Sequence, residues 1–176
     1  MTDAPGDGPR EVLLDVAAIQ AEVTRLAAAI SADYADRRLH LVGVLKSAAV
    51  FVADLMRALA VPATVDFIAT GPYNPASASG VVRLRKDLDD PLEGLDVLLV
   101  EGVCGSGRTL AYLLRNFATR NPASLATCVL LAKRRERLAD VRLDYVGREI
   151  DDVLVVGYGL GLEERHRQLP HVARVS

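Results

Sequence analysis

The chain has 176 residues, which is an ordinary size for one domain. Hydrophobic residues make up 51% of it and charged residues 25%, so the chain can bury a sizeable core. The net charge is −2 and there is no long basic block, so nothing in the electrostatics favours a nucleic-acid or membrane-surface partner.

The two cysteines, Cys104 and Cys128, form no metal-binding pattern and are too few for a disulfide framework. No apolar run reaches the ~18 residues that a membrane helix needs, and residues 1–10 have no apolar signal core. We therefore expect a cytoplasmic protein with a flexible tail over residues 1–10 and a single domain over residues 11–176.

Apolar residues recur at helical spacing through residues 15–36, which predicts an amphipathic helix. The short apolar run at 39–44 predicts a buried strand. A second helix is expected to begin with Ser47 as its N-cap and to run to about Leu59, because Pro62 would stop it.

Alternating apolar residues predict two further strands, at 63–69 and 81–86, joined by a polar loop over residues 70–80. The apolar run at 97–102 predicts a buried strand that leads into a glycine-rich turn at 104–109.

A third helix is expected from Ser106 to about Thr119, followed by apolar strands at 125–131 and 153–158. Apolar strands that alternate with helices predict an α/β fold, in which helices cover both faces of a parallel sheet. Ligands bind such sheets beyond the carboxyl ends of the strands, and the glycine-rich turn lies at one of these ends.

The glycine-rich turn, residues 104–109, has the composition of an anion site. Glycines let the backbone approach an anion, and the following helix would point its N-terminus at it. Ser106 and Thr109 supply hydroxyl groups and Arg108 supplies charge. The alternative is an ordinary strand–helix turn. The segment also fits a P-loop if Arg108 replaces the usual lysine, but the preceding Glu101 would repel phosphate.

Four segments of the chain carry a more specific pattern, in a fixed order. They are LVGVLKSAAVFVADLMRAL (41–59), VRLRKDLDDPLEGLDVLLVE (82–101), VLLVEGVCGSGRTL (97–110) and DYVGREIDDVLVVGYGLGLEERHRQLP (144–170). Together they resemble the hypoxanthine-guanine branch of the type I phosphoribosyltransferases, over about residues 12–175. The resemblance implies a Rossmann-like parallel sheet flanked by helices, with a small hood region.

The resemblance also implies an activity in purine salvage. The phosphoribosyl group of phosphoribosyl diphosphate would pass to hypoxanthine or guanine, giving IMP or GMP and pyrophosphate. It implies Mg²⁺ as cofactor and a homodimer or homotetramer as the assembly. The same resemblance assigns the turn to the 5′-phosphate, with the substrate-binding residues Cys104, Gly105, Ser106, Gly107, Arg108 and Thr109.

The remaining site residues follow from the same resemblance. Lys46 matches the lysine of a pyrophosphate loop that often contains a cis peptide, and Arg167 matches an arginine near the pyrophosphate. Lys133 matches the lysine that reaches the 6-keto oxygen of the base. Leu154 would stack on the base and the backbone of Val155 would read its edge. Without the resemblance, Lys133 and Arg167 would be ordinary surface charges, and Leu154 and Val155 would be ordinary core residues of a strand.

A tyrosine of the mobile loop that closes over the reacting centre in the family corresponds to Tyr73. We assign catalytic roles to Glu101, Lys133 and Arg167, and metal binding to Glu101.

Three acidic positions of the family carry glycine in this chain, at Gly102, Gly105 and Gly161. The loss predicts weakened catalysis, because hydrogen bonds to ribose hydroxyls and help with proton movement would both be missing. Glu163 is a nearby carboxylate that could reach the metal position. The alternative is a catalytically silent relative that binds a nucleotide or phosphoribosyl diphosphate, as a sensor or as a partner subunit.

Overall fold

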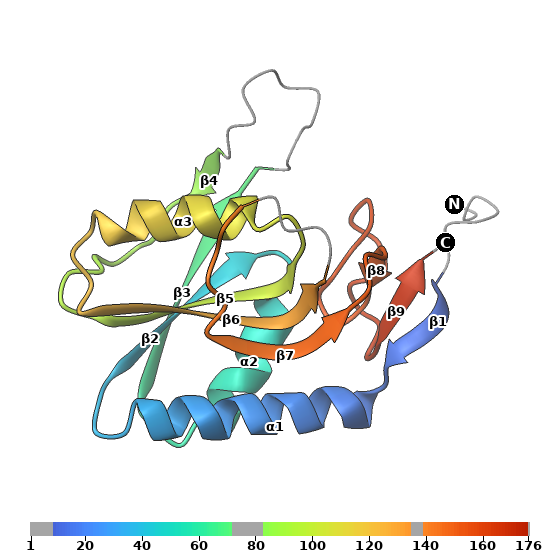
Figure 1. Ribbon diagram of the computed structural model, residues 1–176, viewed down its shortest axis with the longest axis horizontal. Coiled ribbons are helices and arrows are strands. Elements are labelled where there is room, and N and C mark those ends of the chain that lie inside the picture. The colour runs from blue at the N-terminus through green and yellow to red at the C-terminus, as the bar shows by residue number, and fades with distance from the viewer. Residues whose placement is uncertain (1–8, 72–82, 135–138, 176) are drawn as a thin grey trace.

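The computed structural model describes residues 9–71, 83–134 and 139–175. Its centre is a β-sheet with helices on both faces (Figure 1). The strand order is β4-β3-β2-β5-β6-β7. All neighbours in this sheet pair in parallel except β4, which is antiparallel to β3. The strands are β2 (Leu39–Leu45), β3 (Ala63–Thr70), β4 (Leu84–Lys86), β5 (Asp96–Cys104), β6 (Ser124–Lys133) and β7 (Tyr145–Ile150).

Helices cover both faces of the sheet, which is why the central strands are apolar runs rather than alternating ones. The helices α1 (Val16–Asp33) and α2 (Ala49–Ala58) pack on one face, and α3 (Arg108–Ala118) packs on the other (Figure 1). Each face has its own core. Ile19, Leu26 and Phe51 belong to the first, and Leu113 and Phe117 belong to the second.

The expected α/β fold is confirmed, and the hood is a second, smaller sheet. It consists of β1 (Pro9–Leu14), β9 (Val172–Val175) and β8 (Val155–Val156), which pair in the order β1-β9-β8 and are all antiparallel. Residues 1–8 of the expected tail lie outside the described residues, and its last two residues already belong to β1.

Two predictions about local structure are wrong. The apolar run 153–158 is not a strand of the parallel sheet, because Gly157 (φ 95°) and Tyr158 (φ 51°) turn the backbone immediately after β8. Ser47 is not the N-cap of α2. Ala48 holds that position without a side-chain hydrogen bond, and the Ser47 hydroxyl donates to the carbonyl of Val44 at 3.4 Å.

Three strands, β1, β7 and β9, were not predicted. Strand β7 forms the edge of the sheet, and its sequence YVGREI has no apolar run. Strands β1 and β9 are short and pair with each other across almost the whole length of the sequence. The end of the expected strand at 81–86 is β4, which begins at Leu84.

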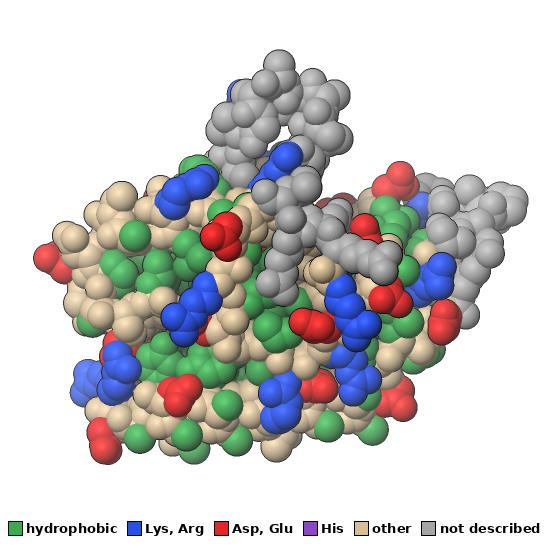
Figure 2. All heavy atoms as spheres, in the orientation of Figure 1, with side chains coloured by type: hydrophobic (Ala, Val, Ile, Leu, Met, Phe, Trp, Pro, Cys, Tyr) green, Lys and Arg blue, Asp and Glu red, His purple; other side chains and the backbone are tan. Residues whose placement is uncertain are grey.

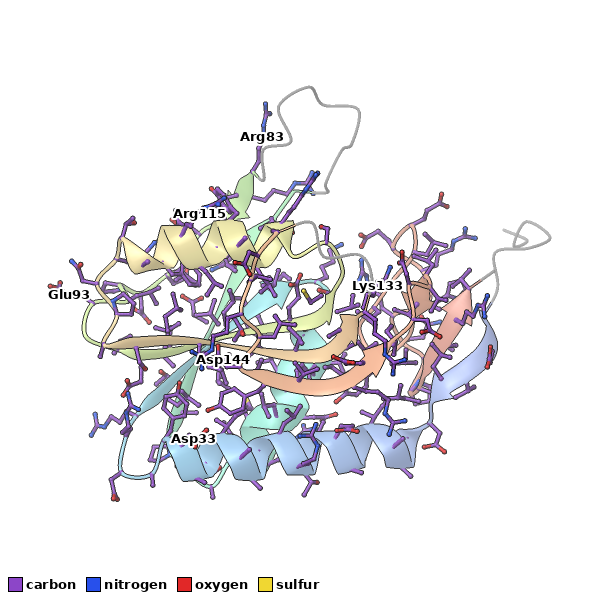
Figure 3. All side chains as sticks on the ribbon, in the orientation of Figure 1. Asp33, Arg83, Glu93, Arg115, Lys133 and Asp144 are labelled. Carbon is purple, nitrogen blue, oxygen red and sulfur yellow. The ribbon has the colours of Figure 1, made fainter. Side chains whose placement is uncertain are left out.

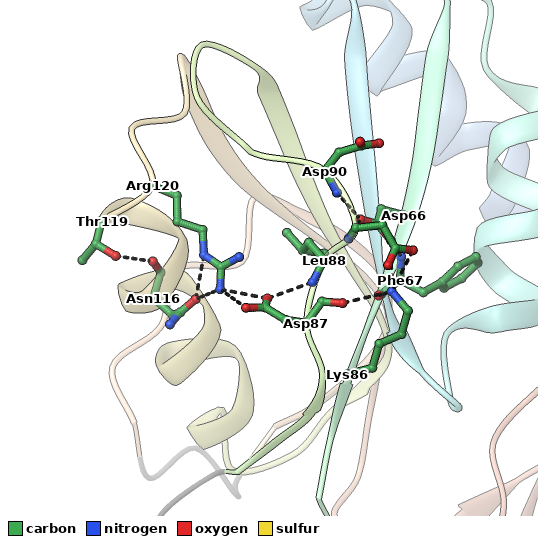
Figure 4. Close-up of polar contacts among 10 residues, drawn as sticks. Asp66, Phe67, Lys86, Asp87, Leu88, Asp90, Asn116, Thr119 and Arg120 are labelled. Atoms are coloured by element: carbon green, nitrogen blue, oxygen red, sulfur yellow. Dashed lines mark hydrogen bonds and ion pairs between the residues drawn. The ribbon is translucent and has the colours of Figure 1, made fainter.

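Side chains also fix the segment that leads into β5 (Figure 4). The buried carboxylate of Asp66 accepts a hydrogen bond from the backbone N–H of Asp89 at 2.7 Å. Arg120, just after α3, donates to Asp87 at 3.0 Å and to Asn116 at 2.7 Å. These contacts tie residues 87–89 to β3 and to the end of α3, in the segment that precedes β5 and its glycine-rich turn.

On the face shown in Figure 2, acidic and basic side chains are interspersed. No helix in the described part of the chain is both long enough and apolar enough to cross a membrane.

Candidate active site

The carboxyl ends of three neighbouring strands bring the expected site residues together. Lys46 follows β2, the glycine-rich turn follows β5, and Lys133 is the last residue of β6. Because these strands are adjacent and parallel, their carboxyl ends lie at one edge of the sheet. Figure 3 shows Lys133 between the end of β6 and the hood.

The glycine-rich turn lines a pocket of about 180 Å³, which we call the phosphate cradle. Its lining residues are Glu101, Val103, Cys104, Gly105, Ser106, Gly107, Thr109 and Leu110. The helix begins at Arg108, two residues later than predicted, with Gly107 as its N-cap. A glycine has no side chain to cap this N-terminus, so its N–H groups suit a bound anion.

The conformation of the cradle depends on Gly107. Its φ of 76° lies in the left-handed region, and a Cβ there would lie 2.8 Å from a methyl of Val141. The carbonyl of Ser106 accepts a hydrogen bond from the backbone of Ala139 at 3.1 Å, which braces the turn. The side chain of Cys104 is buried in the core under α3, so binding by this residue would rest on its backbone.

Glu101 borders the cradle from β5, and burial raises the pKa of its carboxyl to about 8. The acid is therefore mostly neutral at pH 7. The repulsion that we expected between Glu101 and a phosphate largely disappears, because its cause is a charge that burial suppresses.

A second pocket, of about 260 Å³, lies under the hood, and we call it the cation pocket. Its lining residues are Lys46, Ser47, Val103, Lys133, Leu154, Val155, Leu160, Gly161 and Arg167. Val103 lines both pockets, so they adjoin. Leu154 is 47% exposed although it is apolar, whereas Val155 is buried. Lys133 donates to Asp152 at 3.2 Å.

Ion pairs tie two of the three cations in this pocket to one carboxylate. The Leu45–Lys46 peptide is cis, as the resemblance implied. The Lys46 ammonium pairs with Glu164, which also accepts from Arg167 at 3.2 Å. The two cations, Lys46 first, hold the pKa of the Glu164 carboxyl below its usual value. Arg167 donates in addition to the carbonyl of Gly159 at 2.8 Å.

Neighbouring groups occupy the space beside two of the three glycines that stand where the resemblance leads us to expect acidic residues. A Cβ on Gly102 would lie 2.8 Å from the carbonyl oxygen of Ser47 and 2.9 Å from a methyl of Leu160. A Cβ on Gly161 would lie 2.8 Å from Cγ and Cζ of Arg167. The site has therefore closed around these two glycines.

The described residues contain no group of three or more His, Cys, Asp or Glu side chains that could hold a metal ion. Among the residues that the structure describes, Glu101 is the one acidic residue that lines either pocket. Glu163 pairs with Arg165 at 3.1 Å, and its neighbour Glu164 is the carboxylate that meets Lys46 and Arg167. Tyr73 lies outside the described residues.

Sequence reasoning missed Glu164, Asp152 and the carbonyl of Ser47. For Glu164 the sequence does offer a signal. Arg167 follows it by three residues, and oppositely charged side chains at that spacing often form an ion pair. Nothing in the sequence indicates the other two, because they come from segments far from their partners.

Comparison with known proteins agrees with the geometry. The phosphoribosyl transferase domain model matches residues 10–164. The hypoxanthine-guanine phosphoribosyltransferase of Mycobacterium avium is 46% identical over 98% of this chain and 88% of its own length. The one from Bacillus subtilis is 40% identical over 92% of this chain and 91% of its own length.

A solved hypoxanthine-guanine phosphoribosyltransferase from Bacillus anthracis superposes with a TM-score of 0.91 at 36% identity, covering 96% of this chain and all of that one. The chain belongs to the phosphoribosyltransferase family and, within it, to the group of the hypoxanthine-guanine phosphoribosyltransferases.

Proposed function

We propose that this protein transfers the phosphoribosyl group of phosphoribosyl diphosphate to hypoxanthine or guanine, giving IMP or GMP and pyrophosphate, at a reduced rate. The observation that carries the proposal is the pair of adjoining pockets. One is a backbone cradle at a helix N-terminus, and the other is lined by lysines, an arginine and exposed apolar surface.

Each part of the substrates has a matching surface in this arrangement. The 5′-phosphate fits the cradle, where Ser106 and Thr109 supply hydroxyl groups. The flat base fits against Leu154, because it would cover an apolar side chain that is otherwise exposed to water. The Lys133 ammonium would donate a hydrogen bond to the 6-keto oxygen of the base. Lys46 and Arg167 supply the positive charge that a pyrophosphate group requires.

In the reaction, the base displaces pyrophosphate from the anomeric carbon, through a transition state with oxocarbenium character. This chain acts mainly by positioning the two reactants and by stabilising charge on the leaving group. Glu101, as a neutral acid at pH 7, exchanges hydrogen bonds with the ribose hydroxyls. Gly105 leaves no carboxylate to receive the proton of the base, a contribution typically worth about 100- to 10,000-fold in rate.

Mg²⁺ is general in this family, but these residues do not fit a metal held by the protein. Magnesium is usually bound through one or more carboxylates. Among the described residues that line the two pockets, Glu101 is the only carboxylic acid, and its raised pKa leaves it largely uncharged at pH 7. We therefore treat Mg²⁺ as a counter-ion to be supplied with the substrate and attribute no step to it.

The second candidate is a catalytically silent protein that binds a nucleotide or phosphoribosyl diphosphate. It is favoured by the closed space beside Gly102 and Gly161, which leaves no room for the missing carboxylates without movement of their neighbours.

A spectrophotometric assay with hypoxanthine or guanine, phosphoribosyl diphosphate and Mg²⁺ separates the two candidates. We expect turnover below the usual range of about 1–1,000 per second. Lys133→Met should raise KM for the base, since it removes the donor to the keto oxygen. Turnover within the usual range would refute weakened catalysis. No turnover, combined with nucleotide binding by calorimetry, would establish the silent alternative.

We also propose a cytoplasmic homodimer or homotetramer. The resemblance supports the assembly, and the two buried cysteines, which are not joined by a disulfide, suit a reducing compartment. Sedimentation analysis of the purified protein tests the assembly, and a monomer at micromolar concentration would contradict it.

A further inference from the structure

Glu164 does not line the cation pocket, but it pairs with two of the cations that do, and neither the family resemblance nor the proposed reaction uses it. Its two oxygens engage different cations. Oε2 pairs with Lys46 and Oε1 accepts from Arg167 at 3.2 Å. These are two of the three cations that line the pocket, so one side chain engages both and offsets one of its three positive charges.

We propose that Glu164 is an internal counter-ion, which occupies the pyrophosphate-binding cations of the ligand-free protein and is displaced when a pyrophosphate group binds. The inference rests on the proposed function, because that function assigns Lys46 and Arg167 to pyrophosphate. It adds a residue that sets how tightly the pocket holds its anion.

The geometry suits a displaceable contact. The side chains of Lys46 and Glu164 are 65% and 63% exposed, and Arg167 is 27% exposed. Exposed ion pairs are weak, because water screens them and two long side chains must be ordered. Pyrophosphate has more charge and more oxygens than a carboxylate, so it can replace Glu164 on both cations.

Arg167 is held ready for such a ligand. Its guanidinium lies against Gly161, where a side chain would collide with it, and Nη1 donates to the carbonyl of Gly159 at 2.8 Å. Its Nε is buried and has no hydrogen-bond partner among the described residues. A buried donor without a partner is unfavourable, and an anion oxygen arriving beside it would remove that cost.

The loop that carries Glu164 has an unfavourable backbone conformation. Glu163, Glu164 and His166 all have positive φ, at 47°, 67° and 69°, although none is glycine. Such conformations persist where the surrounding contacts fix them, and they cluster at functional sites. The loop therefore turns tightly, and it presents Glu164 to Lys46 and Arg167 while Glu163 pairs with Arg165.

The test is calorimetric titration of the whole protein with sodium pyrophosphate in EDTA, which keeps free metal out of the comparison. Glu164→Gln should bind pyrophosphate about three- to tenfold more tightly than the unchanged protein, because two weak ion pairs no longer compete. The gain should shrink as salt is added, since salt screens exposed charges.

Glu163→Gln is the matched control, because it removes the neighbouring carboxylate, whose described partner is Arg165. It should leave the pyrophosphate Kd within about twofold. Glu164→Gly is the second variant. Glycine accepts the positive φ, so a gain in affinity here would come from the lost charge and not from a disturbed loop.

Equal or weaker binding by both Glu164 variants would overturn the inference, as would the absence of pyrophosphate binding in every protein tested. Hypoxanthine turnover measured alongside separates this inference from the proposed function. Tighter pyrophosphate binding without turnover would refute the proposed reaction alone. Turnover with an unchanged pyrophosphate Kd would refute the counter-ion alone.

Discussion

The phosphate cradle and the cation pocket adjoin, but they are built in different ways. The cradle comes mostly from consecutive residues of one strand–helix turn, and its backbone makes the site. The cation pocket takes its residues from the loop after β2, from the ends of β5 and β6 and from the hood. Its chemistry lies in side chains, and these already bind one another.

This difference indicates where each region is vulnerable. The cradle depends on a backbone conformation that few residues adopt, so a single added methyl group should disrupt it. The cation pocket depends on side chains that can move, so a similar change there should alter binding more than folding. The following variants test this contrast, from the largest expected effect to the smallest.

Gly107→Ala should have the largest effect. The positive φ disfavours alanine, and its Cβ would lie 2.8 Å from Val141. Together these should lower the free energy of unfolding by about 2–4 kcal/mol and weaken IMP binding at least about tenfold. Urea denaturation and calorimetry measure the two effects.

Gly94→Ala is the control for the backbone contribution. Gly94 has a similar φ of 71°, but nothing lies within 4 Å of a Cβ built there. It should cost about 1–2 kcal/mol without a change in IMP affinity. Equal losses of affinity in the two variants would show that the cradle does not depend on Gly107.

Glu101→Gln should change how stability depends on pH. The folded protein holds the Glu101 proton up to about pH 8, whereas an unfolded glutamate releases it near pH 4.5. Between these values the folded state binds more protons, so stability falls as pH rises. The variant lacks this fall, so its gain in stability over the unchanged protein should grow from about 1 kcal/mol at pH 5 to about 3 kcal/mol at pH 7.

Urea denaturation at several pH values measures this gain. Glu93→Gln, in the exposed turn before β5, is the control for the loss of one carboxylate. Parallel pH profiles for the unchanged protein and Glu101→Gln would mean that the Glu101 carboxyl is ionised across this range, so that phosphate repulsion returns.

Gly102→Ala and Gly161→Ala compare two closed positions, Gly161 in the lining of the cation pocket and Gly102 packed against its lining residues Ser47 and Leu160. At Gly102 the nearest atom belongs to the backbone of Ser47, which cannot rotate away, so we expect a loss of about 1–2 kcal/mol. At Gly161 it belongs to the flexible side chain of Arg167, so the loss should stay below about 1 kcal/mol. Thermal unfolding ranks the two, and the reverse order would mean that the loop at Ser47 yields more easily than Arg167.

Much of the site was predictable because it is local. The glycines and hydroxyls of residues 104–109 are adjacent in the sequence, and a strand that runs into a helix places them at the N-terminus of that helix. The order of four matching segments then added Lys46, Lys133 and Arg167. The cation pocket contains all three of them.

The amino-acid sequence by itself determined the α/β fold, the glycine-rich turn of the phosphate cradle, and the presence of Gly102 and Gly161. Its apolar runs and its glycines act over a few residues. The tertiary structure alone decided what fills the space beside those glycines, that burial leaves Glu101 mostly neutral at pH 7, and that Glu164 rather than Glu163 meets the cations. Each of these depends on distances between segments far apart in the chain, and such distances are set only when the sheet and the hood pack together.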